Sequence, residues 1–124
     1  MTTYGTPLRR PGPRLTGVAA GVLLFVILEL TLATGLIHLS LGGTLFTLNG
    51  FGFLALGAAY LASAILPWPV VRQFAWLPRL GLALFAAVTI GAYLVIGPYI
   101  TLGWIAKGIE LAIIGLVTVD LLVD

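Results

Sequence analysis

Four long apolar stretches, separated by glycines and prolines, dominate the pattern of this chain. An α-helix rises about 1.5 Å per residue, so each stretch is long enough to cross most or all of a hydrocarbon core of about 30 Å. Helix breakers separate the stretches at Gly42-Gly43, Pro67-Trp68-Pro69 and Gly97-Pro98. The pattern therefore predicts helices at about 15–40, 44–66, 79–97 and 101–123.

The connections between these stretches predict how the helices are arranged. The first and last connections are only a few residues long, so the helices on either side of each should be antiparallel neighbours. We expect an all-α membrane protein with an antiparallel four-transmembrane-helix bundle, formed by residues 15–124 as a single domain. Residues 1–14 are rich in proline and arginine and predict a flexible tail, and residues 70–78 predict a segment lying among the lipid headgroups.

Small residues recur at fourfold spacing in every apolar stretch. Such residues allow helices to approach closely in lipid, where no hydrophobic force draws one helix to another. We expect these positions to form contacts between helices of one chain, with a dimer seam as the alternative. They are Gly17 and Gly21, Ala55, Ala59 and Ser63, Ala87 and Gly91, and Gly108 and Ala112.

Polar residues inside the apolar stretches gather at one depth. Helix rise, counted from the ends away from the tail, puts Glu29 and Glu110 roughly 15 Å deep and the others at shallower levels. A charge at such a depth must be neutralised, paired or turned toward a polar group. Lys107 and Glu110 are three residues apart and share a face, and we expect Glu29 to meet them. The predicted cluster comprises Glu29, Asn49, Thr89, Tyr93, Lys107 and Glu110.

The expected Glu–Lys–Glu group has two interpretations. One lysine between two carboxylates leaves an excess negative charge, so one glutamate should carry a proton. A shared proton suits a proton-coupled or cation-handling site, but it equally suits a static polar clamp between two helices. Lys107 could instead extend its ammonium group to the outer headgroups and leave Glu29 alone. The sequence leaves these interpretations open.

His38 lies on the opposite face of the first helix from Glu29, because nine residues correspond to about half a turn beyond two full turns. It shares that face with Thr31, Thr34 and Gly35. Three environments for this face remain: the outer headgroups, a partner protein, or a haem or chlorophyll-type pigment with His38 as an axial ligand. A single histidine cannot supply both axial ligands of a bis-histidine haem. No other metal site is expected.

The amino-acid composition indicates which environment surrounds the chain. Of the 124 residues, 60% are apolar and only 8% are charged, and the mean hydropathy is +1.18. Soluble domains carry about 25% charged residues, so lipid must surround most of this chain. The absence of cysteine excludes disulfides, thiolate metal sites and thiol nucleophiles. The net charge of +2 does not indicate a nucleic-acid partner, because the basic residues lie where membrane topology requires them.

Arginine positions predict the orientation. The tail carries Arg9, Arg10 and Arg14 and the middle connection carries Arg72 and Arg79, whereas the other two connections have no lysine or arginine. The positive-inside rule therefore places both termini in the cytoplasm. At that level Asp120 and Asp124 are expected to form interfacial ion pairs with these arginines. Trp68 and Trp76 mark the inner interface, and Tyr93, Tyr99 and Trp104 mark the outer one.

Catalytic patterns are missing from the chain. It has two serines and one histidine, and it lacks an HExxH sequence, a phosphate-binding loop and an acidic cluster at metal-ligand spacing. His38 and Ser40 are two residues apart and do not face each other on a helix. We do not expect an enzyme.

The stretches LFTLNGFGFLALGAAYL, AVTIGAYLVIG and ITLGWIAKGIELAIIGLVTVD resemble small four-helix membrane proteins of bacteria that have no assigned activity. The distinctive marks are Asn49-Gly50 and Lys107-x-x-Glu110. The resemblance implies a bundle in the bacterial inner membrane and suggests that the polar cluster matters.

These observations favour a non-catalytic accessory or assembly subunit of a larger membrane complex, respiratory or photosynthetic. Its partners would be the lipid bilayer and other membrane subunits or further copies of the chain. The alternative is a small oligomeric proton- or ion-linked transporter that uses Glu29, Lys107 and Glu110. No inverted repeat relates the two halves.

Overall fold

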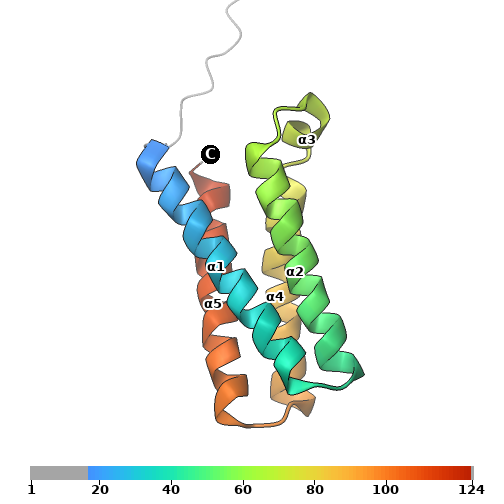
Figure 1. Cartoon of the computed structure of the whole chain (residues 1–124). Coiled ribbons are helices and arrows are strands. Elements are labelled where there is room, and N and C mark those ends of the chain that lie inside the picture. Colours follow the sequence, from blue (N-terminus) through green and yellow to red (C-terminus); the bar gives the residue numbers. More distant parts are fainter. Residues whose placement is uncertain (1–16, 124) are drawn as a thin grey trace, which may run out of the picture.

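The computed structural model describes residues 17–123, and within them all regular structure is helical. The predictions for residues 1–14, for Asp124 and for the first residues of the first helix lie outside the described part. Figure 1 shows the order of the helices, which are α1 (Gly17–Leu41), α2 (Thr44–Ile65), α3 (Pro69–Gln73), α4 (Trp76–Ile96) and α5 (Thr101–Leu122).

Glycine and proline end the long helices where the sequence predicts it. Gly42 and Gly43 have φ angles of 72° and 86°, a left-handed conformation that side chains with a Cβ disfavour, and they turn the chain from α1 into α2. Pro69 begins α3, where its missing N–H is not needed. The chain after Gly97 is extended and leads through Pro98 into α5.

The segment 70–78 differs from the prediction of a single interfacial stretch. Pro69–Gln73 forms one short helix, Phe74 and Ala75 turn the chain, and α4 begins at Trp76 instead of residue 79. Pro78 does not prevent this, because the N–H groups of a helix's first turn have no intrahelical partner. The tryptophans on either side of the turn, Trp68 and Trp76, are both exposed.

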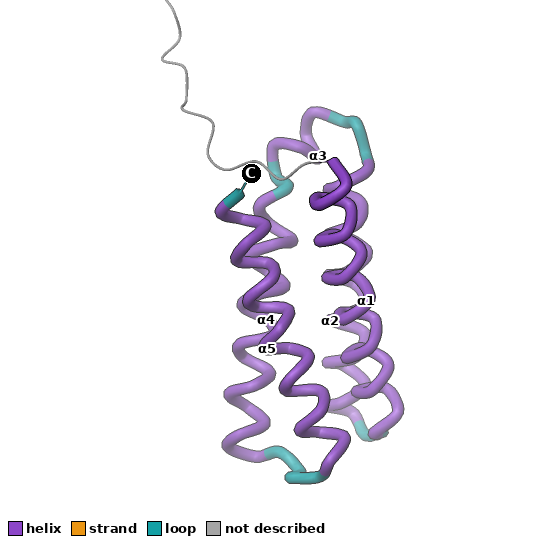
Figure 2. Tube along the Cα trace, turned by 90° about the vertical axis from the view of Figure 1, so that its left-hand side faces the viewer, coloured by secondary structure: helices purple, strands orange, loops and turns teal. Residues whose placement is uncertain are grey.

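The four long helices lie side by side in two pairs (Figures 1 and 2). α1 packs against α2 and α5, and α4 packs against α5 and α2. The start of α1, the end of α5 and the short helix α3 lie at one end, which we call the α3 end. The two connections α1–α2 and α4–α5 lie at the other, which we call the turn end. The apolar core between the pairs consists of Ile27, Phe53, Tyr60, Leu82, Ala86, Ile113 and Val117.

Most of the small residues expected between the helices do not lie there, so that prediction was wrong for all of them except Ser63, which contacts Arg79 of α4. A Cβ built on Gly21, Gly91 or Gly108 would meet nothing within 4 Å, and the alanines of the predicted stripes are exposed. The close contact is made instead by Gly35 of α1 and Gly50 of α2. A Cβ on Gly50 would lie 2.9 Å from the carbonyl oxygen of Gly35, so only glycine fits at this crossing.

Most of the outward surface of the helices is apolar. Three helices are long and apolar enough to cross a membrane, namely Gly17–Leu41, Thr44–Ile65 and Trp76–Ile96. Their exposed residues include Phe25, at 63% exposure, and Val95, at 79%. The fourth long helix, α5, has 22 residues and carries Lys107, Glu110 and Asp120. The described residues are therefore all-helical in their regular structure, as predicted, and three of their helices are candidates for membrane-spanning segments.

Candidate functional site

A buried ion pair lies on the inward face of α5. The ammonium nitrogen of Lys107 donates to both carboxylate oxygens of Glu110, at 2.8 and 2.7 Å. The exposure of Lys107 is 7% and that of Glu110 is 0%. The spacing of three residues brings the side chains together on one helix face. The Lys107 nitrogen also lies 5.1 Å from the centre of the Tyr93 ring on α4, a cation–π contact.

The partner of this pair on α1 is the His38 face. Thr31, Thr34 and His38 are buried among the helices. The Thr34 hydroxyl interacts with the Glu110 carboxylate, and the charge of Lys107 acts on the His38 ring. This burial differs from the expected contact with the outer headgroups, whereas contact with a partner protein or a pigment stays a prediction. The His38 face forms the interior of the protein, and it joins α1 to α5.

Glu29 does not join the cluster, which corrects the central prediction from the sequence. Its side chain is exposed and borders a groove of about 210 Å³ between α1 and α2, away from α5. It makes no hydrogen bond or salt bridge with any residue in 17–123. Thr31, two residues further on, is buried and donates its hydroxyl to the carbonyl of Ile27. The inward face of α1 is thus the one opposite to Glu29.

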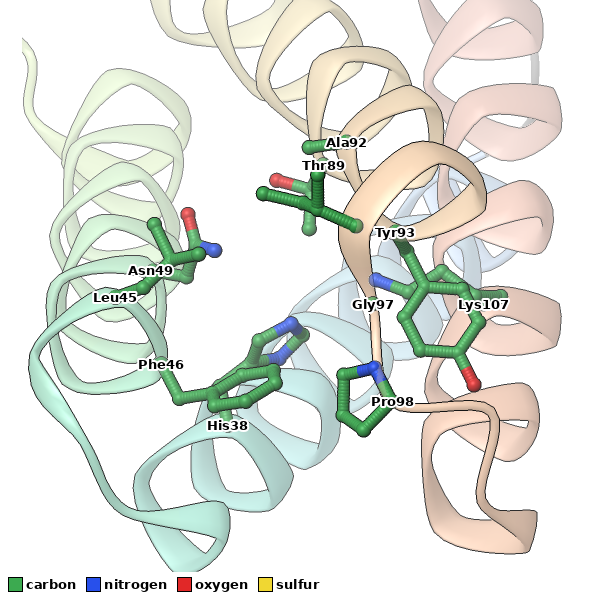
Figure 3. A pocket seen from close by; sticks show the side chains of 11 residues that line it. His38, Leu45, Phe46, Asn49, Thr89, Ala92, Tyr93, Gly97, Pro98 and Lys107 are labelled. Carbon is green, nitrogen blue, oxygen red and sulfur yellow. The ribbon is translucent and has the colours of Figure 1, made fainter.

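A cavity of about 80 Å³ opens beside the buried pair at the turn end (Figure 3). The nitrogen Nδ1 of His38 lies 2.7 Å from the carbonyl oxygen of Thr34. Because a carbonyl only accepts, Nδ1 carries the proton, and Nε2 keeps a lone pair. Asn49 and Thr89 face the same cavity, and neither side chain hydrogen-bonds to another described residue. The polar groups of the lining are His38, Asn49, Thr89, Tyr93 and Lys107.

The geometry around His38 does not fit a tetrapyrrole. Its ring lies between Phe46 and Phe53, with centroids 6.0 and 5.5 Å away. The adjoining cavity of about 80 Å³ is far smaller than a porphyrin or chlorin ring. Ligation of a haem or chlorophyll-type pigment by His38 would require the two helix pairs to separate. Within residues 17–123, no group of three or more metal-ligating side chains is found.

A second polar cluster ties the helices together at the α3 end. Arg79 of α4 donates from Nε to Asp120 of α5 at 2.8 Å, and from Nη1 to Ser63 of α2 at 3.0 Å. The hydroxyl of Tyr60 also donates to Asp120, and the Arg79 guanidinium lies 4.7 Å from the centre of the Tyr60 ring. The sequence suggested an ion pair for Asp120 but did not assign Tyr60 to it. The sequence does contain a pattern that could have indicated this role of Tyr60. Asn49, Phe53, Tyr60 and Ser63 form a stripe along one face of the second helix.

An apolar layer separates the two clusters. Ile27, Phe53, Leu82 and Ile113, all 0% exposed, belong to this layer. Lys107 and Glu110 lie on its turn side, and Arg79 and Asp120 lie on its α3 side. Among the described residues, no buried side-chain nitrogen or oxygen lacks a hydrogen-bond partner. Satisfied polar networks of this kind hold helices in one arrangement.

Comparison with models of protein families, with curated proteins and with solved structures found no match to this chain.

Proposed function

We propose that the protein is an accessory or assembly subunit that spans the membrane four times and works by contact with another membrane protein. Three helices suit a membrane by length and apolarity. The fourth long helix, α5, supports the same placement, because its charged residues Lys107 and Glu110 are buried inside the protein. Its outward residues are apolar, among them Ile105 and Leu111, at 50% and 65% exposure.

The observation that carries the proposal is the position of Glu29. It is an exposed carboxylate near the middle of α1, surrounded by apolar residues, and it has no partner among residues 17–123. A charge facing lipid at that depth is unfavourable by several kcal/mol, roughly 2.5–3.5 kcal/mol for an aspartate on insertion scales. Packing within residues 17–123 leaves this unfavourable term in place, so either a proton on Glu29 or a polar group from outside these residues relieves it, and a partner protein can supply such a group.

The groove beside Glu29 is lined mainly by apolar and small residues, which suit contact with a partner helix. Gly57 and Ala58 of α2 form part of its floor, and small residues let a second helix approach closely. A partner helix that carries a lysine, an arginine or another hydrogen-bond donor at this depth would pair with the carboxylate. The buried Lys107–Glu110 pair is satisfied within the chain and serves as the clamp that keeps α1 and α5 together.

Site-specific photo-crosslinking in native membranes tests this contact. A photoreactive residue at Leu32, which lines the groove, should give one adduct with a different membrane protein in fixed stoichiometry. The same residue at Leu111, an exposed position on α5, is the control and should give none. Glu29→Gln should abolish the Leu32 adduct while leaving thermal unfolding unchanged. Adducts with lipid alone, or with a second copy of the chain alone, would contradict the proposal.

A second candidate function is a small oligomeric transporter for protons or ions. The supporting observation is the cavity beside His38, which lies next to a buried carboxylate and a buried ammonium group. In this second proposal, Glu110, Lys107 and His38 bind or transfer the ion, and Glu29 is not involved. Proton or cation flux into liposomes that contain only this protein, abolished by Glu110→Gln, would establish it. Absence of flux from an intact reconstituted oligomer would exclude it.

A further inference from the structure

A cavity of about 420 Å³ lies at the α3 end, apart from the Lys107–Glu110 network. It lies where the start of α1, the ends of α2 and α5, α3 and the start of α4 meet. Trp68 and Trp76, the exposed tryptophans beside α3, belong at the level of lipid headgroups, where indole rings accumulate. The lining consists of Ala20, Gly21, Leu24, Ser63, Ala64, Arg72, Ala75, Arg79 and Asp120.

Arg79 lies in the wall of this cavity, and part of its guanidinium group has no hydrogen-bond acceptor among the described residues. A guanidinium has five N–H donors. Nε donates to Asp120, and Nη1 donates to Ser63 at 3.0 Å and to the Ala75 carbonyl at 2.6 Å. Neither proton of Nη2 has an acceptor among the described residues. Since no buried side-chain nitrogen in that part of the chain lacks a partner, Nη2 must be accessible, and the cavity is the space that Arg79 borders.

Arg72 supplies a second, uncompensated positive charge. It lies in the last turn of α3 and is exposed, and its guanidinium forms no hydrogen bond or ion pair with another described residue. Asp120 carries the only negative charge among the lining residues, and its carboxylate already accepts from Arg79 and Tyr60. Two arginines and one aspartate leave this cavity with a net charge of one positive unit.

We propose that this cavity binds the phosphate group of a monoanionic phospholipid from the leaflet at the α3 end. A phosphodiester carries one negative charge, which matches the net charge of the cavity. Its unesterified oxygens accept from planar arginine donors in pairs, with Arg79 held in place and Arg72 closing from α3. The apolar wall formed by Ala20, Gly21 and Leu24 of α1 suits the glycerol and upper acyl carbons, which free phosphate lacks.

This site is independent of the contact proposed for Glu29, since it lies at the end of the bundle and uses no residue of that groove. An experiment can therefore contradict the lipid-binding site without contradicting the contact at Glu29, and the reverse also holds. Binding of lipid at the α3 end requires only that the chain is embedded in a membrane.

Native mass spectrometry of the full chain, extracted from vesicles of mixed phosphatidylglycerol and phosphatidylcholine, tests the site. One phosphatidylglycerol should be retained in preference to phosphatidylcholine. Arg72→Gln should weaken its retention about tenfold, because one charge-assisted contact is lost. Gln73→Ala, next to it on α3, is the matched control and should change nothing. Arg79→Lys should also weaken retention, since lysine keeps the charge but loses the planar donors.

The second arm separates lipid from free phosphate. Inorganic phosphate is added to protein in phosphatidylcholine vesicles, and no stable adduct is expected. An adduct with inorganic phosphate that Arg72→Gln removes, without selective retention of phosphatidylglycerol, would overturn the assignment to lipid. Equal retention of both phospholipids, or retention that Arg72→Gln leaves unchanged while the variant unfolds at the same temperature as the parent, would overturn the site itself.

Discussion

The ammonium nitrogen of Lys107 lies within 2.8 Å of both carboxylate oxygens of Glu110, and the two side chains are enclosed by α1, α4 and α5. Both partners of this pair belong to one helix, so it forms without help from the rest of the chain. What the tertiary structure adds is the enclosure: Thr34 approaches the carboxylate from α1, and the Tyr93 ring covers the ammonium group from α4.

Replacing one partner of this pair should destabilise the protein severely. Lys107→Met leaves the Glu110 carboxylate buried without a counter-charge, and such losses are about 3–5 kcal/mol. The double variant Lys107→Met with Glu110→Leu should recover most of this loss, because it buries no charge. The loss in the single variant and its recovery in the double variant are measured as changes in the free energy of unfolding in mixed detergent micelles. If the double variant is as unstable as Lys107→Met, the loss of stability does not come from an unpaired buried charge, and this explanation is contradicted.

Glycine at the crossing of α1 and α2 should be far less replaceable than glycine on the surface. Gly50→Ala brings a methyl group to 2.9 Å from the Gly35 carbonyl and closer still to Leu39, so we expect a loss of about 1–3 kcal/mol from overpacking. Gly108→Ala is the control, since a Cβ there meets nothing within 4 Å, and it should cause no loss. Equal behaviour of the two variants in thermal unfolding would contradict the close contact.

The cluster at the α3 end should depend on the Tyr60 hydroxyl. Tyr60→Phe removes one of the two hydrogen bonds that the Asp120 carboxylate accepts, and a hydrogen bond to a charged group contributes about 1.5–3 kcal/mol. Tyr99→Phe, which removes a hydroxyl from a 60% exposed tyrosine, should have a clearly smaller effect. Unfolding midpoints of the two variants, measured in the same detergent, make the comparison. A smaller effect at Tyr60 than at Tyr99 would rule out the proposed importance of the cluster.

The arginines at the α3 end predict that this end faces the cytoplasm. Because the chain has no cysteine, single cysteines report on topology without background. Gln73→Cys, beside Arg72, should react with a membrane-impermeant thiol reagent only after the cells are opened. Thr101→Cys, at the turn end, should react from outside in intact cells. The reverse pattern would invert the orientation, and labelling of both in intact cells would contradict four spans.

Local features of the fold were predictable from the sequence because their causes are local. The ends of α1, α2 and α4 follow from Gly42, Gly43, Gly97 and the prolines, which restrict the backbone wherever they occur. The contact between Lys107 and Glu110 follows from a spacing of three on a helix. The start of α4 was placed three residues too late, because residues 70–78 were interpreted as one interfacial segment, whereas Trp76, Leu77 and Pro78 form the first turn of the helix.

The sequence by itself determined that the chain is helical, that three of its helices are long and apolar enough to cross a membrane, and which residues of one helix share a face. It did not determine which face of α1 turns inward, because that helix is apolar almost all round and carries a polar group on either side. The similar depth of Glu29 and Glu110 says nothing about the direction in which each side chain points around its helix axis. Only packing decided this: the close crossing at Gly35 and Gly50 rotates Thr34 and His38 toward α5 and leaves Glu29 outside.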